Sequence, residues 1–206
     1  MIDMPRLKEK AIIQLDPDEI ASLLDYMENY GNGLTGVQLY HYNKQKYIAI
    51  VTLLLGTGIR VSECVGLNIS DVDFKNNGIR VLRKGGNEMV VYFGLEVEAA
   101  LKDYLELSRN KITPLSGHEN ALFLSGQRKR ISVDAIEKMV KKYSSAISVK
   151  TITPHKLRST YGTALYRETG DIYLVADVLG HSDVNTTKKH YARLSDDRRR
   201  AASKAV

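Results

Sequence analysis

The middle of the chain holds three short segments in which apolar and polar residues alternate, and this feature restricts the possible fold most. The segments lie at residues 71–74, 79–82 and 89–93. Residues 76–78 (Asn-Asn-Gly) separate the first two, and residues 84–87 (Lys-Gly-Gly-Asn) separate the last two. Alternation with a period of two predicts half-buried strands, and such turn residues between neighbouring strands predict hairpins. The sequence therefore predicts a small three-stranded antiparallel sheet.

Helical patterns occupy most of the chain on both sides of this sheet. The first begins at Asp16-Pro17-Asp18-Glu19, which supplies a capping residue, a proline at the first helical position and an acid at the third. Apolar residues recur at helical spacing in several further segments. Helices are expected near residues 16–30, 44–56, 60–67, 95–109, 133–147, 155–168, 171–179, 184–191 and 195–205. The expected fold class is therefore α+β, mainly α-helical, with a small three-stranded antiparallel sheet.

Charge and cysteine content narrow the class of partner and the compartment. The 206 residues carry 30 Lys and Arg against 24 Asp and Glu, a formal net charge of +6. A basic balance favours a polyanion such as nucleic acid, because each neutralised phosphate releases counterions, although a merely basic protein would show the same balance. Cys64 is the single cysteine, so an intrachain disulfide is excluded and a buried core position is expected. No secretory signal or membrane span is expected, and the predicted location is cytoplasmic.

Arg60 is the first candidate functional residue. It follows Thr57-Gly58, which interrupts a strongly apolar helical pattern. Glu63 lies three residues on, within reach of the arginine on a helix. The pair predicts either a surface ion pair or a guanidinium that Glu63 orients toward phosphate oxygens.

His155 and Arg158 form a second candidate pair. They lie three residues apart behind Pro154, near an expected helix start, and therefore share one helix face. A helix N-terminus also favours an anion. Taken alone, His155 is as readily a capping or core histidine as a functional one.

Three further residues complete the set of candidates. Lys84 lies in the second turn, where a glycine-rich hairpin can carry an ammonium group over a bound strand, although a solvated turn lysine is the simpler interpretation. Arg83 competes for that role and should point to the opposite face. His181 follows Gly180 and could cap a helix end, and Tyr191 is one of 12 tyrosines, most of which pack in cores.

Together, in this order, the segments resemble the catalytic domain of the tyrosine recombinases, the phage integrase family. The resemblance extends from about Asp16 to Tyr191. Its motifs are residues 57–63 (TGIRVSE), Lys84 in 83–87 (RKGGN), residues 153–158 (TPHKLR), and residues 179–181 (LGH) with Thr186, Thr187 and Tyr191. The resemblance implies that Arg60, Lys84, His155, Arg158, His181 and Tyr191 are catalytic, with Glu63 in support.

The resemblance also implies a mechanism. A phenol has a pKa of about 10, so Tyr191 needs help to lose its proton before it attacks a phosphodiester, and His155 would assist. Arg60, Arg158 and His181 would stabilise the phosphate oxygens, and Lys84 would protonate the leaving 5′-oxygen. The product would be a 3′-phosphotyrosyl link that another strand can attack. No metal or other cofactor is expected.

Domain boundaries and partners are likewise expectations from the resemblance. Residues 1–15 are expected to be a linker to an N-terminal core-binding domain, 16–194 the catalytic domain, and 195–206 a C-terminal helix or tail. The expected partner is double-stranded DNA, with self-association as a tetramer on DNA through 195–206. A mobile-element integrase is favoured. The alternatives are a non-cutting DNA-binding regulator on the same fold, a type IB topoisomerase-like enzyme, and a metal nuclease using His155 and His181.

Overall fold

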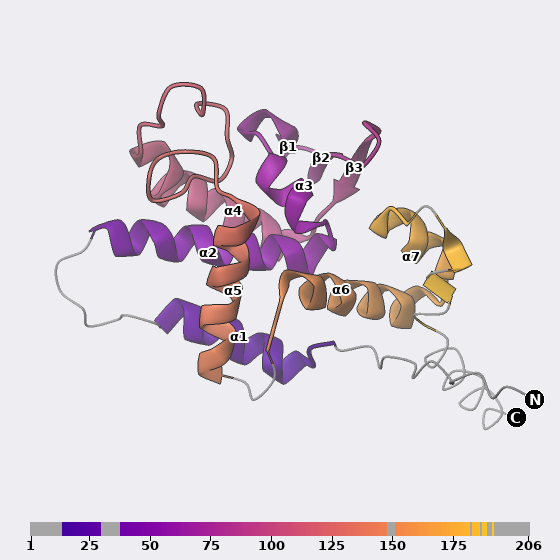
Figure 1. Ribbon diagram of the computed structural model, residues 1–206. Helices are drawn as coiled ribbons and strands as arrows, with labels where there is room; N and C mark the ends of the chain where they lie inside the picture. Colours follow the sequence, from indigo (N-terminus) through magenta and orange to yellow (C-terminus); the bar gives the residue numbers. More distant parts are fainter. Residues whose placement is uncertain are drawn as a thin grey trace, which may run out of the picture.

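The computed structural model describes residues 14–29, 38–147, 151–181, 183–185, 187–188 and 191, with the backbone alone over 38–42. Helices make up most of this part of the chain. One small sheet follows α3 and precedes α4 in the chain, and it lies beside α3 in space (Figure 1). The elements are α1 (Pro17–Asn29), α2 (Gln38–Thr57), α3 (Val61–Gly66), η1 (Ile69–Asp71), β1 (Val72–Asp73), β2 (Gly78–Leu82), β3 (Glu88–Tyr92), α4 (Leu95–Leu107), η2 (Arg109–Lys111), α5 (Val133–Ile147), α6 (Pro154–Thr169) and α7 (Ile172–Leu179).

The sheet confirms the α+β prediction. Its strands run in the order β1-β2-β3 and every neighbouring pair is antiparallel. Ile79 pairs with Val91, and these side chains face the core, whereas Leu82, Val90 and Tyr92 are exposed on the other face. β1 has two residues, fewer than the four expected, because Asp71 belongs to η1 and the partner strand β2 begins at Gly78, opposite Asp73.

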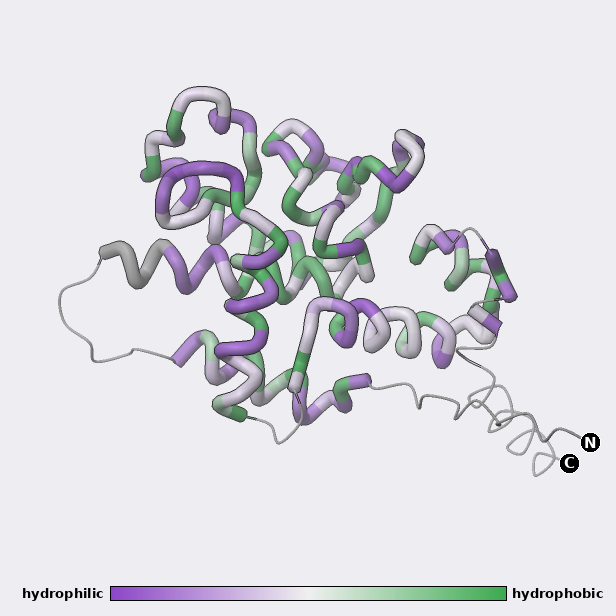
Figure 2. Tube along the Cα trace, in the orientation of Figure 1, coloured by the Kyte–Doolittle hydropathy of each residue, from purple (hydrophilic) through white to green (hydrophobic). Residues whose placement is uncertain are grey.

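The main core forms around α2, which packs against α4, α6 and α1. Five consecutive or near-consecutive side chains of α2 are essentially inaccessible: Ala49, Ile50, Val51, Leu53 and Leu54. Burial on all sides explains why this helix shows an apolar run instead of a single stripe. Figure 2 shows hydrophobic residues gathered at the centre, where these helices meet. Cys64 is buried in the same core, as predicted.

Capping residues place the helix ends as the local sequence indicates. The Asp16 carboxylate accepts from the backbone N–H of Glu19 at 2.8 Å, and Glu19 accepts from the N–H of Asp16 at 3.0 Å. This capping box begins α1. Thr153 caps α6, with Pro154 at its first turn, and the carboxylate of Asp171 accepts from two backbone N–H groups to cap α7. These caps position α6, which carries His155 and Arg158, and α7, which His181 follows.

Two arginines, the buried Arg109 and the half-buried Arg130, hold the long connection between α4 and α5. Arg109 donates to the carbonyls of Glu119 and Ala121 at 2.6 and 3.0 Å. Arg130 donates to the carbonyls of Val65 and Leu67 at 3.0 and 2.6 Å, at the end of α3. Part of the excess of basic residues therefore stabilises the fold, and Arg130 in particular fixes the short helix that follows Arg60.

Some expectations fall outside the described residues. Residues 1–13, and the segment 195–206 expected to form a last helix, belong to this group. The backbone is helical at 184, 185, 187, 188 and 191, within the segment 184–191 that was expected to be a helix. Among the residues that the structure describes, no helix combines the length and the apolar character needed to cross a bilayer.

Candidate functional site

Arg60 lies immediately before α3, and Glu63 orients it. The backbone N–H of Arg60 donates to Glu63 Oε2 at 2.8 Å, and its Nη1 donates to Glu63 Oε1 at 2.8 Å. Its Nη2 donates to the carbonyl of Gly180 at 2.7 Å. The arginine side chain is 34% exposed, whereas that of Glu63 is 3% exposed. The guanidinium is therefore held by buried groups while part of it faces solvent, unlike a simple surface ion pair.

Arg158 and His155 project from the first two turns of α6. Arg158 is buried and donates from Nη1 to the carbonyl of Gly58 at 2.5 Å and from Nη2 to the carbonyl of Leu179. His155 is exposed at the start of the same helix. The guanidinium thus links Gly58, just after α2, to Leu179 at the end of α7, two segments that are remote in the sequence.

His181 is placed by the end of α7. Gly180 adopts a left-handed backbone (φ 62°), and the N–H of His181 donates to the carbonyl of Ala176 at 2.9 Å. This is the pattern of a Schellman motif, which turns the chain sharply after a helix. The Nδ1 atom of His181 shares a hydrogen bond with the Thr187 hydroxyl at 2.6 Å, which fixes the orientation of the ring. The sequence pointed to His181 but not to this role of Thr187.

Lys84 and Arg83 lie at the turn between β2 and β3 and point apart. Lys84 is exposed, as expected for a residue that reaches toward a ligand. Arg83 is 8% exposed and donates from Nη2 to the carbonyl of Val178 at 2.7 Å. Its Nη1 lies 3.7 Å from Glu63 Oε1. The sequence named Arg83 only as a rival to Lys84, although alternation along a strand already indicated that one of the two would point inward.

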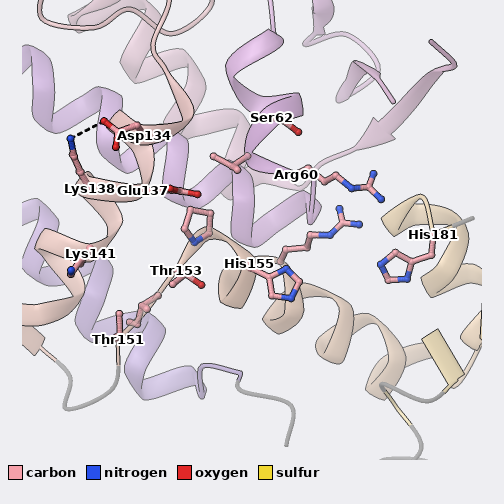
Figure 3. A pocket seen from close by; sticks show the side chains of 14 residues that line it. Arg60, Ser62, Asp134, Glu137, Lys138, Lys141, Thr151, Thr153, His155 and His181 are labelled. Carbon is pink, nitrogen blue, oxygen red and sulfur yellow. Dashed lines mark ion pairs between the residues drawn. The ribbon is translucent and has the colours of Figure 1, made fainter. Parts of the chain in front are cut away.

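These side chains surround two adjoining hollows, which we call the cationic cleft. The first, of about 760 Å³, is lined by Arg60, His155, Arg158 and His181, among others. Figure 3 shows Arg60, His155 and His181 directed toward one another at one end, with Asp134 and Glu137 of α5 at the other. The second hollow, of about 920 Å³, shares Arg60 and His181 with the first. It is also lined by Arg83, Lys84, Glu88, Asp177 and Asp183.

The inner part of the cleft carries more positive than negative charge. Three guanidiniums, those of Arg60, Arg83 and Arg158, act on the buried carboxylate of Glu63. Burial, followed by the positive charge of Arg60, lowers the pKa of Arg158 from 12.5 to about 10, and Glu63 partly opposes this. With a pKa of about 10, Arg158 is still protonated at neutral pH. Such a concentration of cations favours a bound anion, and paired guanidiniums match the geometry of a phosphate.

Tyr191 lies beside this cleft and not inside it. Its side chain is 1% exposed, and its ring packs against Tyr166 with the centroids 5.7 Å apart. A Cβ atom added to Gly162 would lie 2.2 Å from the Tyr191 hydroxyl oxygen, so the absence of a side chain at 162 allows this approach to α6. Burial raises the pKa of Tyr191 to about 12, although the charge of Arg158 and the nearby Thr163 hydroxyl oppose the shift.

The distance from Tyr191 to the cleft follows from the helix geometry. Gly162 lies four residues after Arg158 and seven after His155, so all three share one face of α6. At a rise of 1.5 Å per residue, the backbone of Gly162 lies about 6 Å beyond that of Arg158 along the helix axis. Neither hollow is lined by Tyr191. The structure therefore brings Arg60, Glu63, Lys84, His155, Arg158 and His181 together. It buries the tyrosine hydroxyl against Gly162 on the same face of α6, where the charge of Arg158 still acts on it.

A metal ion is bound by several side chains that lie close together. Within the described ranges, His, Cys, Asp and Glu side chains do not gather in groups of three or more of the kind that binds a metal ion.

Comparison with known proteins gives matches over most of the chain. Residues 14–198 match the model of the phage integrase family. Tyrosine recombinase XerS of Streptococcus thermophilus (strain CNRZ 1066) is 37% identical over 190 residues, which cover 89% of this chain and 53% of that protein. XerS of Streptococcus agalactiae serotype III is 35% identical over 193 residues, covering 91% and 54%. The chain thus spans about half the length of the curated relatives it matches.

Solved structures share the fold. The crystal structure of XerA recombinase superposes with a TM-score of 0.73 at 31% identity, covering 87% of this chain and 60% of that one. The Tn1549 transposon integrase (residues 82–397) in complex with circular intermediate DNA gives a TM-score of 0.67 at 26% identity, covering 90% and 62%. XerH recombinase in a post-cleavage complex with palindromic difH substrate gives 0.76 at 20% identity, covering 97% and 55%.

Proposed function

The chain belongs to the phage integrase family, and from that premise we propose that it cleaves and rejoins DNA strands as a site-specific recombinase. The observation that carries the proposal is the cationic cleft, where Arg60 and Arg158 lie beside His155 and His181 around one buried carboxylate. This arrangement suits a single phosphodiester of a DNA duplex. Residues 16–194 would form the catalytic unit, in line with the expectation from the sequence.

The chemistry requires one bond to form and one to break. The Tyr191 oxygen attacks phosphorus, and the bond from phosphorus to the 5′-oxygen breaks. His155 assists removal of the phenol proton, and Lys84 supplies a proton to the leaving 5′-oxygen. Arg60, Arg158 and His181 stabilise the charge that grows on the non-bridging oxygens. The 3′-phosphotyrosyl ester retains the bond energy, so a 5′-hydroxyl can reverse the step without an added energy source.

Tyr191 must leave its present position for this reaction. Its hydroxyl is buried against Gly162 of α6, out of reach of a DNA strand, and this burial raises its pKa. Movement toward Arg158 would bring the oxygen next to two guanidiniums and relieve the burial that raises its pKa. The described arrangement is therefore a resting state in this proposal, and DNA binding would favour the displaced tyrosine.

Partners and setting are further proposals. Double-stranded DNA is the proposed substrate, supported by the DNA complexes of the Tn1549 integrase and XerH. Tetramer formation through residues 195–206 and a cytoplasmic location stay predictions. A mobile-element role also stays a prediction, because the relatives include XerS proteins as well as a transposon integrase.

The test uses a nicked suicide DNA duplex that traps the covalent intermediate. The wild-type chain is expected to give a protein–DNA adduct on a denaturing gel, with or without EDTA. Tyr191→Phe should give none, and Arg60→Ala or Arg158→Ala should give little. DNA binding without an adduct would favour the non-cutting regulator, and loss of cleavage in EDTA would favour a metal nuclease. Relaxation of supercoiled DNA by the monomer without strand exchange would favour a topoisomerase-like activity.

A further inference from the structure

Arg83 occupies a slot between α7, α3 and β3, beside the hollow that Arg60 and His181 line. Its guanidinium donates to the carbonyl of Val178 in α7, lies 3.7 Å from Glu63 in α3, and contacts Met89 Sδ of β3 at 3.3 Å. A Cβ atom added to Gly180 would lie 2.1 Å from Arg83 Nη1. The side chain therefore fills the space between the β2–β3 hairpin and the segment that presents His181.

The backbone of Arg83 closes the turn that carries Lys84. Its N–H donates to the carbonyl of Asn87 at 2.8 Å, and its carbonyl accepts from the N–H of Gly86 at 3.0 Å. Lys84 is the next residue, about 3.8 Å away from Cα to Cα. Gly85 and Gly86 follow with φ values of 96° and 85°, a backbone that restrains the turn little. The anchor that limits where Lys84 can point is therefore Arg83.

An arginine is a poor choice of side chain if its role here is only to fill space. Arg83 is buried, yet its Nε and Nη1 atoms have no hydrogen-bond acceptor. A buried cation with unsatisfied donors costs free energy, and an apolar side chain of similar length would fill the same space without that cost. Burial lowers the pKa of Arg83, with Glu63 partly opposing. What the guanidinium adds over an apolar chain is a directed link from the hairpin to the Val178 carbonyl and the Glu63 carboxylate.

We propose that Arg83 is a positioning residue that fixes the Lys84 turn against α7 and Glu63, so that Lys84 can protonate the leaving 5′-oxygen. The inference rests on the proposed function and assigns Arg83 no contact with DNA, because its buried nitrogens face protein. Its loss should then impair the protonation step in particular, and leave phosphate binding by Arg60 and Arg158 in place.

The experiment compares two suicide duplexes that differ in one atom at the scissile phosphate. One has the natural bridging 5′-oxygen, and the other has sulfur there. A thiol has a pKa near 8.5, so the sulfur leaves without a proton donor, whereas the oxygen needs one. On the oxygen substrate, Lys84→Ala is expected to lower the cleavage rate by about 10²-fold or more, and Arg83→Met by about 10- to 100-fold. On the sulfur substrate, both variants should recover to within a few-fold of wild type.

Matched variants separate positioning from folding. Arg80→Met removes an exposed arginine of β2, the strand that leads into the Arg83 turn. Arg80 pairs with Asp71, and the variant should cleave both substrates as wild type does. Arg83→Lys keeps the cation and should retain more activity on the oxygen substrate than Arg83→Met. The double variant Arg83→Met with Lys84→Ala should be no slower than Lys84→Ala alone, because both changes affect one step.

Several results would overturn the inference. If Arg83→Met lowered the cleavage rate equally on both substrates while sulfur rescued Lys84→Ala, Arg83 would have a general structural role instead. Unchanged cleavage by Arg83→Met, or a double variant much slower than Lys84→Ala, would also refute it. Lack of rescue for Lys84→Ala would remove Lys84 as the acid and the inference with it. Absence of an adduct from the wild-type protein on both duplexes would instead overturn the proposed function itself.

Discussion

The buried Tyr191 hydroxyl predicts a specific loss of stability in alkali. Burial raises its pKa from the ordinary 10.0 to about 12 in the folded protein. A group with a raised folded-state pKa contributes stability that is complete below the unfolded pKa and disappears as the pH passes the folded pKa. The full contribution corresponds to about 2.7 kcal/mol, and about 1.4 kcal/mol of it should be lost by pH 11. Tyr191→Phe cannot ionise at this position and should avoid that loss.

Urea unfolding of wild type and Tyr191→Phe at pH 8 and pH 11 measures this difference. The drop in unfolding free energy between the two pH values should be smaller in the variant by about 1.4 kcal/mol. Burial also raises the pKa of Cys64 to about 12 and that of Tyr104, but both groups are present in both proteins and cancel in the comparison. An identical drop in the two proteins would refute the buried position of the hydroxyl against α6.

Two further variants test the packing around the cleft. Arg158→Met leaves two buried carbonyls without their donor and should lower the unfolding free energy by about 2–5 kcal/mol. Arg60→Met should cost less, about 1–2 kcal/mol, because Arg60 is 34% exposed and the Glu63 carboxylate that it leaves keeps Arg83 at 3.7 Å. Equal losses in urea unfolding would contradict this. Gly162→Ala should push the Tyr191 hydroxyl off α6 and increase nitration of Tyr191 by tetranitromethane, measured by mass spectrometry. The control Gly66→Ala, where an added Cβ meets nothing within 4 Å, should leave the nitration of Tyr191 unchanged. Unaltered nitration in Gly162→Ala would show that the helix tolerates the added methyl without moving the tyrosine.

Much of the secondary structure could be predicted because its signals are local. The Asp16–Glu19 capping box, the Pro154 start of α6 and the turns between the strands each depend on residues within a few positions of one another. The start of α2 at Gln38 and the shortness of β1 were not predicted. Both depend on what the element pairs or packs with, and adjacent residues do not encode that.

Some features of the candidate site could likewise be predicted from the sequence, and others could not. The sequence alone indicated Arg60, His155, Arg158 and His181, because each lies in a short motif beside a helix end, and the structure brings them to one cleft. It did not indicate how Arg158 is held, since its two acceptor carbonyls lie 100 and 21 residues away.

By itself, therefore, the sequence determined which elements form, where they are capped, and which cationic residues stand at their ends. Only the tertiary structure decided that Arg83 is buried as a link between the hairpin and α7, and that the Tyr191 hydroxyl rests on α6 over Gly162. Caps and turns act over a few bonds, whereas the position of a buried side chain depends on the close fit of segments that are distant along the chain.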